Sequence, residues 1–223
     1  MAITFTNCSK DDSEPDAPKV AKRMKSIDDL KFTYSDGKIV QVKDGSYTDK
    51  VTYTESTIKI DDQVYYLNNE GLVSKFTESD GSYQEFTYKD GRINTWKKYY
   101  RSGGIDEDIS FEWKDGVIVR QTQYDGKNRN LFCDYQYTYT KDLDYGGAVA
   151  CFQSNSMFYD DLPECLIVQG YFGKWPKYLV SGAVDMAEYF DDAESYTYIL
   201  DSDGYPVRMS GTDKATFSWE EVK

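Results

Sequence analysis

The chain has 223 residues, and its 26 lysines and arginines stand against 39 aspartates and glutamates, which gives a formal charge of -13. A surface of this charge repels polyanions, so no nucleic-acid partner is expected. The sequence contains no histidine, which excludes Ser-His-Asp and Cys-His catalysis and histidine-ligated metals; it predicts no catalytic residue, no cofactor and no metal.

Residues 1–18 resemble the end of a bacterial lipoprotein signal peptide followed by an acidic tether. Residues 1–7 are mostly apolar, Cys8 comes next, and residues 9–15 are polar and acidic. The run Lys10-Asp11-Asp12 is similar to the export tag of surface lipoproteins in Bacteroidetes. The resemblance implies lipidation at Cys8 and a place at the outer membrane, cell surface or periplasm. The alternative is a disordered acidic tail with an incidental cysteine.

No run approaches the roughly 18 apolar residues of a spanning helix, so membrane contact is expected only through the lipid anchor at Cys8. Residues 19–223 read as a single β domain because turn signals punctuate them regularly. Asp-Gly supplies the positive φ angles that tight hairpin turns need. The pairs are Asp36-Gly37, Asp44-Gly45, Asp80-Gly81, Asp90-Gly91, Asp115-Gly116, Asp125-Gly126 and Asp203-Gly204.

Between these turns, apolar and polar residues alternate with a period of two. This pattern is typical of antiparallel strands that bury one face. The apolar faces are Phe32 and Tyr34; Val51 and Tyr53; Phe86 and Tyr88; Ile109, Phe111 and Trp113; Tyr135, Tyr137 and Tyr139; Tyr196, Tyr198 and Leu200; and Ala215, Phe217 and Trp219.

Aligned on their turns, three segments repeat in one register. Residues 32–39, 86–93 and 111–118 each run aromatic, any residue, aromatic, one residue, Asp-Gly, any residue, aliphatic. A degenerate copy covers residues 196–207. Repetition of this kind predicts that each hairpin buries its aromatic face against the next.

The repeating unit is similar to the tyrosine-aspartate repeats of the RHS type. With the stretch 170–179, it makes residues 19–223 resemble a Bacteroidetes family of lipoprotein domains of unknown function that has a porin-like fold. The resemblance implies an all-β antiparallel meander of short hairpins, arranged as a curved single sheet or a partly closed barrel. It implies no activity and supplies no catalytic residue.

The meander is interrupted by an irregular capping segment near residues 143–193, which is rich in glycine and proline. Residues 157–165 and 183–190 within it fit either helical turns or strands. Long irregular segments are often functional, so a partner site is one reading. The favoured alternative is a plug, because dense aromatic residues usually find burial. Its rings are Phe152, Phe158, Tyr171, Phe172, Trp175 and Tyr178.

Three cysteines remain once Cys8 is set aside: Cys133, Cys151 and Cys165. In an oxidising envelope, Cys151 and Cys165 are the preferred disulfide pair, because a bridge between them would constrain the irregular segment.

Aromatic side chains on an exposed sheet face would stack on sugar rings. The candidate ligand-binding residues are Trp96, Trp113, Trp175, Tyr171 and Tyr178. The sequence thus favours a non-enzymatic envelope lipoprotein, a binding or scaffold module for a glycan, a peptide or a partner protein, and leaves its oligomeric state open.

The alternative is a carboxylate-dependent polysaccharide hydrolase. Such an enzyme needs two convergent carboxyl groups, one of which stays protonated near neutral pH. The acidic pairs are Asp106 with Asp108, Asp160-Asp161, Asp191-Asp192 and Glu220-Glu221.

Overall fold

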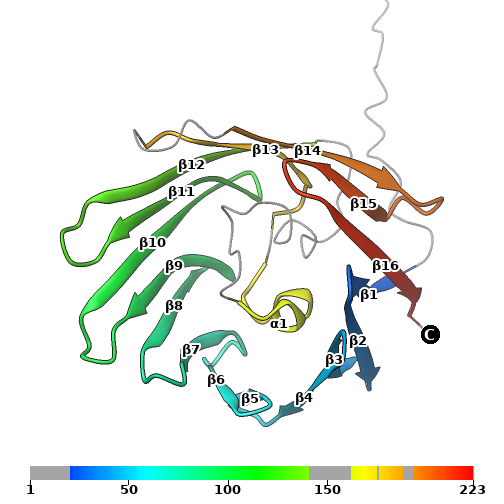
Figure 1. Ribbon diagram of the computed structural model, residues 1–223, viewed down its shortest axis with the longest axis horizontal. Helices are drawn as coiled ribbons and strands as arrows, with labels where there is room; N and C mark the ends of the chain where they lie inside the picture. Colours follow the sequence, from blue (N-terminus) through cyan, green and yellow to red (C-terminus); the bar gives the residue numbers. More distant parts are fainter. Residues whose placement is uncertain (1–20, 141–161, 175, 188–192, 223) are drawn as a thin grey trace, which may run out of the picture.

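The computed structural model describes residues 21–140, 162–174, 176–187 and 193–222, and these form one closed antiparallel β-barrel (Figure 1). Each strand pairs with its neighbours in the sequence, and β16 pairs with β1 to close the ring. The strands are β1 (Lys22–Ile27), β2 (Leu30–Ser35), β3 (Lys38–Asp44), β4 (Tyr47–Tyr53), β5 (Thr57–Ile60), β6 (Gln63–Leu67), β7 (Val73–Thr77), β8 (Tyr83–Lys89), β9 (Arg92–Tyr99), β10 (Ile105–Lys114), β11 (Val117–Asp125), β12 (Leu131–Tyr139), β13 (Val180–Asp185), β14 (Ala193–Leu200), β15 (Pro206–Gly211) and β16 (Ala215–Glu221).

All seven Asp-Gly pairs lie at connections between consecutive strands, as predicted. In the three repeat copies, both residues of the turn have positive φ, for example 54° at Asp90 and 70° at Gly91. The strands pair directly across these two-residue loops, with Lys89 opposite Arg92. This is the geometry of a type I′ turn, whose twist matches that of the flanking strands. The three turns lie at the same rim of the barrel, because successive connections of an antiparallel meander alternate between its two ends.

The predicted apolar faces point into the barrel and, with the exception of Leu200, join one core. Ile39, Ile93 and Ile118, the aliphatic residues that end the three repeat copies, are fully buried. Each lies opposite the second aromatic residue of its own copy, as Ile93 does with Tyr88. The repeat is therefore a packing unit in which one hairpin supplies a ring and the aliphatic side chain beside it.

Ring side chains also bridge the gaps between neighbouring hairpins. A β-bulge leaves a backbone carbonyl outside the strand ladder, and a ring from the next hairpin donates a hydrogen bond to it. The donors and acceptors are Tyr34 to Met24, Tyr53 to Ile39, Tyr88 to Val73, Trp113 to Ile93, Tyr139 to Ile118, Tyr198 to Val180 and Trp219 to Pro206, at 2.5 to 2.8 Å. Each acceptor residue borders a shift in strand register. The rings therefore join the hairpins where the backbone does not.

Removing one of these donors should destabilise the barrel without removing a ring. Tyr88 donates from its hydroxyl to the Val73 carbonyl at 2.5 Å, and burial raises the pKa of this phenol. Tyr88→Phe leaves the carbonyl without that donor, so we expect a loss of about 1–3 kcal/mol in the free energy of unfolding. Urea denaturation followed by tryptophan fluorescence measures it. Tyr47→Phe, at a ring that is 79% exposed, should change stability little, and equal effects of the two substitutions would contradict the bridging role.

The interior holds a short helix, α1 (Glu164–Val168), which lies inside the ring of strands (Figure 1). Leu166 and Phe172 are fully buried, and the Phe172 ring meets the Phe86 ring edge-on at 5.2 Å. Within the described residues, no helix is long and apolar enough to cross a membrane. The described part of the irregular segment is thus a plug, the favoured reading of its aromatic residues. Phe152 and Phe158 lie outside the described residues.

The sequence predicted an antiparallel meander in a curved sheet or a partly closed barrel, and the sheet closes fully into a barrel. One expectation needs correction. The irregular segment was expected to extend to near residue 193, but Val180–Asp185 is the barrel strand β13, so the strand reading holds for residues 183–185. Gly182 made this stretch look irregular, since glycine often interrupts a strand. A glycine is needed here for steric reasons, because a Cβ at this position would lie 2.8 Å from the carbonyl oxygen of Glu194.

The outward face of the barrel is mostly polar, with exposed apolar side chains at Tyr66, Val184 and Ile199. Ion pairs join neighbouring strands at Lys75 and Glu85 (3.1 Å) and at Lys97 and Asp108 (3.2 Å). Hydroxyl pairs join others, such as Thr87 with Thr95. Pairs of this kind contribute little each in water, but together they define which face meets solvent.

Salt bridges support the closure of the ring. Lys22 at the start of β1 contacts Asp201 at 2.7 Å and Asp203 at 2.5 Å, in the turn between β14 and β15. Arg23 contacts Glu220 on β16 at 2.6 Å. The first strand is therefore held to the last three by charge as well as by its ladder.

This closure should weaken in acid. Burial would raise the pKa of Asp201, but hydrogen bonds from Lys22 and from the amides of Tyr205 and Asp203 outweigh it and hold that pKa below its ordinary value. The contribution of Asp201 is therefore complete above the unfolded pKa of about 4 and is lost as pH falls. The pKa of Lys22 is raised by its hydrogen bonds to the two carboxylates, so its own contribution is lost only in alkali.

We expect the stability difference between the native chain and Asp201→Asn to shrink as the pH is lowered from 7 to 3. Urea midpoints across this range measure it. A difference that stays constant would show that the carboxylate charge at Asp201 does not support the closure.

Candidate functional site

A cleft opens where strands β9 and β10 separate. Their pairing runs from Tyr99 opposite Ile105 to Thr95 opposite Ser110, and it stops there. Beyond this point the β8–β9 and β10–β11 hairpins diverge toward their turns. The cleft between them has a volume of about 380 Å³. It is lined by Lys89, Asp90, Arg92, Asn94, Phe111, Glu112, Trp113, Lys114, Asp115 and Gly116.

Trp113 spans this cleft. Its indole Nε1 donates to the Ile93 carbonyl at 2.7 Å, which fixes the ring across the gap between the hairpins. The guanidinium of Arg92 lies over the same ring, 5.5 Å from its centroid. A planar cation stacked on an indole is held in place by the ring quadrupole. The cleft therefore presents an arginine supported by a tryptophan, both placed by one repeat interface.

The remaining lining is charged or polar. Lys89 and Lys114 provide two ammonium groups and Asn94 an amide. Three carboxylates, from Asp90, Glu112 and Asp115, balance the three cations of the lining. The cleft thus offers donors and acceptors to one ligand, next to an aromatic ring.

The plug closes the rim that bears this cleft. The amide of Lys174 donates to the Gly91 carbonyl at 2.7 Å, and the amide of Lys177 donates to the Gly116 carbonyl at 3.2 Å. Gly173 fits here because its φ is +93° and a Cβ would lie 2.8 Å from the Gly91 oxygen. The segment thus runs from turn to turn along what we call the plugged rim, the end formed by the turns at 36–37, 54–56, 68–72, 90–91, 115–116 and 201–205.

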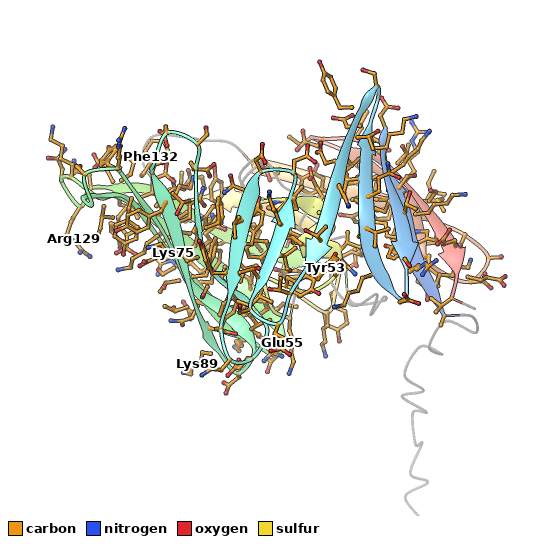
Figure 2. The ribbon with its side chains drawn as sticks, turned by 90° about the horizontal axis from the view of Figure 1, so that it is seen from below. Tyr53, Glu55, Lys75, Lys89, Arg129 and Phe132 are labelled. Atoms are coloured by element: carbon orange, nitrogen blue, oxygen red, sulfur yellow. The ribbon has the colours of Figure 1, made fainter. Side chains whose placement is uncertain are left out.

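Figure 2 shows Glu55 and Lys89 at the plugged rim and Phe132 at the opposite rim. Lys89 ends β8 beside the turn 90–91, whereas Phe132 follows the 126–130 connection. The cleft is therefore far from the opposite rim.

The structure brings some of the predicted ligand-binding residues to the plugged rim. Trp113 lines the cleft. The ammonium group of Lys177 lies over the ring of Tyr178, 4.7 Å from the ring centroid. Tyr171 is half-buried and stacks on Tyr53 at 6.0 Å. Trp96 is different, since it is 2% exposed inside the barrel.

Trp96 therefore has no face available for a sugar, and its Nε1 donates to the side-chain oxygen of Gln84 at 2.7 Å. Trp175 lies outside the described residues.

The sequence did not single out Arg92 and Asn94, which also line the cleft. The only signal for Arg92 was its position directly after an Asp-Gly turn, which Lys38 and Val117 occupy in the other two copies.

The described cysteines do not suggest nucleophilic chemistry. Cys133 and Cys165 are buried, and neither forms a disulfide with another described cysteine. Burial raises the pKa of Cys133 to about 11 and that of Cys165 to about 12, so both disfavour the reactive thiolate. Cys151 and Cys8 lie outside the described residues, and the Cys151–Cys165 disulfide and the lipidation of Cys8 stay predictions.

A second, smaller cleft of about 280 Å³ lies at the opposite rim. It is lined by Tyr100, Asp106, Glu107, Gln123, Asp125, Lys127 and Phe132. Its carboxylates already have structural partners. Glu107 pairs with Lys98 at 2.7 Å, and Asp125 accepts the Lys127 amide at 2.7 Å.

Only two of the predicted acidic pairs lie in the described residues, and a member of each is engaged in an ion pair. Asp108 of the predicted Asp106 and Asp108 pair contacts Lys97 on the outward face, and Glu220 contacts Arg23. Asp160, Asp161, Asp191 and Asp192 lie outside the described residues. The cleft beside Trp113 is therefore the stronger candidate for a binding site.

No protein-family model and no curated protein matches the sequence. Among solved structures, the chain is similar to a porin-like protein from Bacteroides uniformis, with a TM-score of 0.65 and 15% identity over 86% of this chain and 90% of that one. It is also similar to a porin-like protein from Bacteroides vulgatus, with a TM-score of 0.65 and 14% identity over 90% of this chain and 100% of that one. At these identities the likeness concerns the fold alone, and it shows that this chain has the porin-like fold, an antiparallel barrel of sixteen strands in its described residues.

Proposed function

We propose that this chain is a non-enzymatic lipoprotein of the bacterial cell envelope that binds a glycan in the cleft beside Trp113. The observation that carries the proposal is a barrel with a mostly polar outward face and a plugged rim on which a polar, aromatic cleft opens. Such a barrel presents its ligand site on its surface.

The charged side chains on the outward face support the proposal that the barrel is surrounded by water and not by lipid. A transmembrane barrel carries an apolar band on the lipid side. Here the corresponding positions of β7 to β12 carry the ion pairs Lys75–Glu85 and Lys97–Asp108, and Arg120 contacts Asp134 at 2.6 Å. Burying such pairs in lipid is costly. Contact with the membrane is therefore assigned to a lipid on Cys8.

The cleft itself supports a sugar ligand. Its volume of about 380 Å³ lies within the usual range for small-molecule sites. Sugars present hydroxyl groups on a ring with apolar C–H faces, and the lining pairs an aromatic ring, Trp113, with an amide, Asn94, and carboxylates such as Glu112. These groups complement both kinds of sugar surface.

Binding is favoured over hydrolysis because glycosidases need two convergent carboxyl groups with separated pKa values. In the smaller cleft, Glu107 and Asp125 are engaged in structural contacts. In the cleft beside Trp113, the three carboxylates share the lining with three cations. The geometry thus supports a binding module without chemistry.

The test is titration of the full chain with a panel of neutral and acidic oligosaccharides, read by tryptophan fluorescence and calorimetry. We expect saturable binding that Asn94→Ala and Glu112→Ala each weaken at least fivefold. Gln41→Ala, at an exposed position on β3 away from the cleft, should leave the affinity unchanged. Absence of saturable binding across the panel, or binding that neither cleft variant weakens, would overturn the proposal.

The envelope assignment has its own test. Metabolic labelling with a fatty-acid analogue, followed by cell fractionation, should yield a labelled membrane-associated protein, and Cys8→Ala should abolish the label. An unlabelled native chain in the cytosolic fraction would overturn this assignment and leave glycan binding to be judged separately.

A further inference from the structure

We infer that the glycan bound beside Trp113 is acidic and that Arg92 receives its carboxylate group. The inference rests on the proposed function and adds the class of ligand and the residue that selects it. Its starting point is the state of the Arg92 side chain.

Arg92 is a cation held in a defined place without an anionic partner. It begins β9 directly after the Asp90-Gly91 turn, and its guanidinium lies 5.5 Å from the centroid of the Trp113 ring. Its Nε is buried and has no hydrogen-bond partner. Within the part of the chain that the structure describes, its guanidinium has no ion pair either, whereas Arg23 and Arg120 each contact a carboxylate at 2.6 Å. Nε has almost no exposed surface, so an arriving acceptor would meet the terminal guanidinium nitrogens, which are not among the buried atoms without a partner.

The chemistry of the guanidinium points to a carboxylate. Its planar set of donors matches the two oxygens of a carboxyl group, which it binds in a bidentate manner. Stacking on Trp113 limits the rotation of the Arg92 side chain, so little further ordering is needed when a ligand binds. A carboxylate at this position would also lie beside the indole, against which the sugar ring that bears it would pack.

The carboxylates of the cleft limit the charge of the ligand. Asp90, Glu112 and Asp115 lie in the same lining as the three cations, and the whole chain carries a formal charge of -13. A densely charged polyanion would be repelled by both. A sugar with one carboxylate and several hydroxyl groups suits the site better, because the hydroxyls donate to the protein carboxylates. The ligand class is therefore a uronic-acid glycan.

Two lysines of the plug segment favour the same sign of ligand. The Lys174 side chain lies 3.5 Å from the Cβ position of Gly91, and that of Lys177 lies 3.4 Å from the Cβ position of Gly116. Both turns border the cleft. These ammonium groups make the plugged rim locally basic next to the cleft, which would favour the approach of an anionic sugar.

The test compares oligogalacturonate with its methyl ester, which has the same sugars without the charge. Calorimetric titration of the full chain should give at least tenfold tighter binding of the acid. Arg92→Gln should remove this preference, and Arg92→Lys should restore part of it, because lysine keeps the charge and loses the planar donors. Arg129→Gln makes the same charge change at an exposed residue of the 126–130 connection on the opposite rim and should leave the preference intact. Far-UV circular dichroism checks that the variants fold.

The outcomes separate the two proposals. Equal affinity for the acid and the ester, or a preference that survives Arg92→Gln, would overturn the inference while glycan binding stands. Binding of neutral oligosaccharides alone would do the same. If no oligosaccharide of the larger panel binds, the proposed function fails and the inference fails with it. If one Arg92 variant does not fold, the other still tests the role of Arg92, and the comparison of acid with ester in the native chain decides whether the bound glycan is acidic.

Discussion

Phe172→Ala should lower the free energy of unfolding by about 3–5 kcal/mol, the usual cost of removing a fully buried ring. Phe172 is 0% exposed, and its ring meets Phe86 edge-on at 5.2 Å. Phe86 in turn stacks with Phe76 and Trp96. The substitution therefore leaves a cavity between the plug and the inner wall of β8. Urea denaturation followed by far-UV circular dichroism measures the loss.

Phe132→Ala is the matched control because it removes the same ring from a position that is 51% exposed, at the opposite rim (Figure 2). We expect a change within about 1 kcal/mol there. If Phe172→Ala were as mild as Phe132→Ala, the plug would not contribute to the stability of the barrel, and the core described here would reduce to the inner faces of the strands.

The hairpins were predictable because their signals are local. Asp-Gly specifies the positive φ angles of the turn, and the alternation around it specifies which residues face inward. The closure of the barrel has no such signal. It depends on pairing between β1 and β16, for example of Ile27 with Phe217. The residues of each strand give no indication of which distant strand it pairs with. The first half of strand β13, residues 180–182, was assigned to the irregular segment because a glycine in a sequence usually suggests a break. Gly182 is instead required by the close approach of the Glu194 carbonyl.

The candidate site was predictable only in part. Trp113 was identified as an aromatic residue of the repeat, but its role differs from that of an exposed platform, since its indole bridges two hairpins and supports Arg92. The equivalent position after the turn is Lys38 in one copy and Val117 in another. Arg92 therefore could not be recognised as a site residue from the sequence. It lines a cleft because β9 and β10 separate, and that separation is a property of the folded barrel.

Gly211→Ala should destabilise the chain by about 4 kcal/mol, because two separate costs add. The φ of Gly211 is +148°, a conformation that side chains rarely adopt, and a Cβ built there would lie 1.8 Å from the carbonyl oxygen of Ser195. Backbone strain of this kind costs about 1–3 kcal/mol, and forcing a methyl group into a packed contact costs about 1–3 kcal/mol more. Because Gly211 pairs with Tyr196 across β14 and β15, relief of the overlap would separate two barrel strands.

Gly103→Ala isolates the first cost from the second. Gly103 has a φ of +86°, and nothing lies within 4 Å of its Cβ position, so this substitution should cost only the backbone strain, about 1–2 kcal/mol. The difference between the two variants in urea midpoint then measures the overlap with Ser195. Equal midpoints would mean that β14 and β15 accommodate the methyl group by a shift of the ladder. A larger loss of stability for Gly211→Ala would show that β14 and β15 cannot move apart to make room for the methyl group while the barrel stays closed.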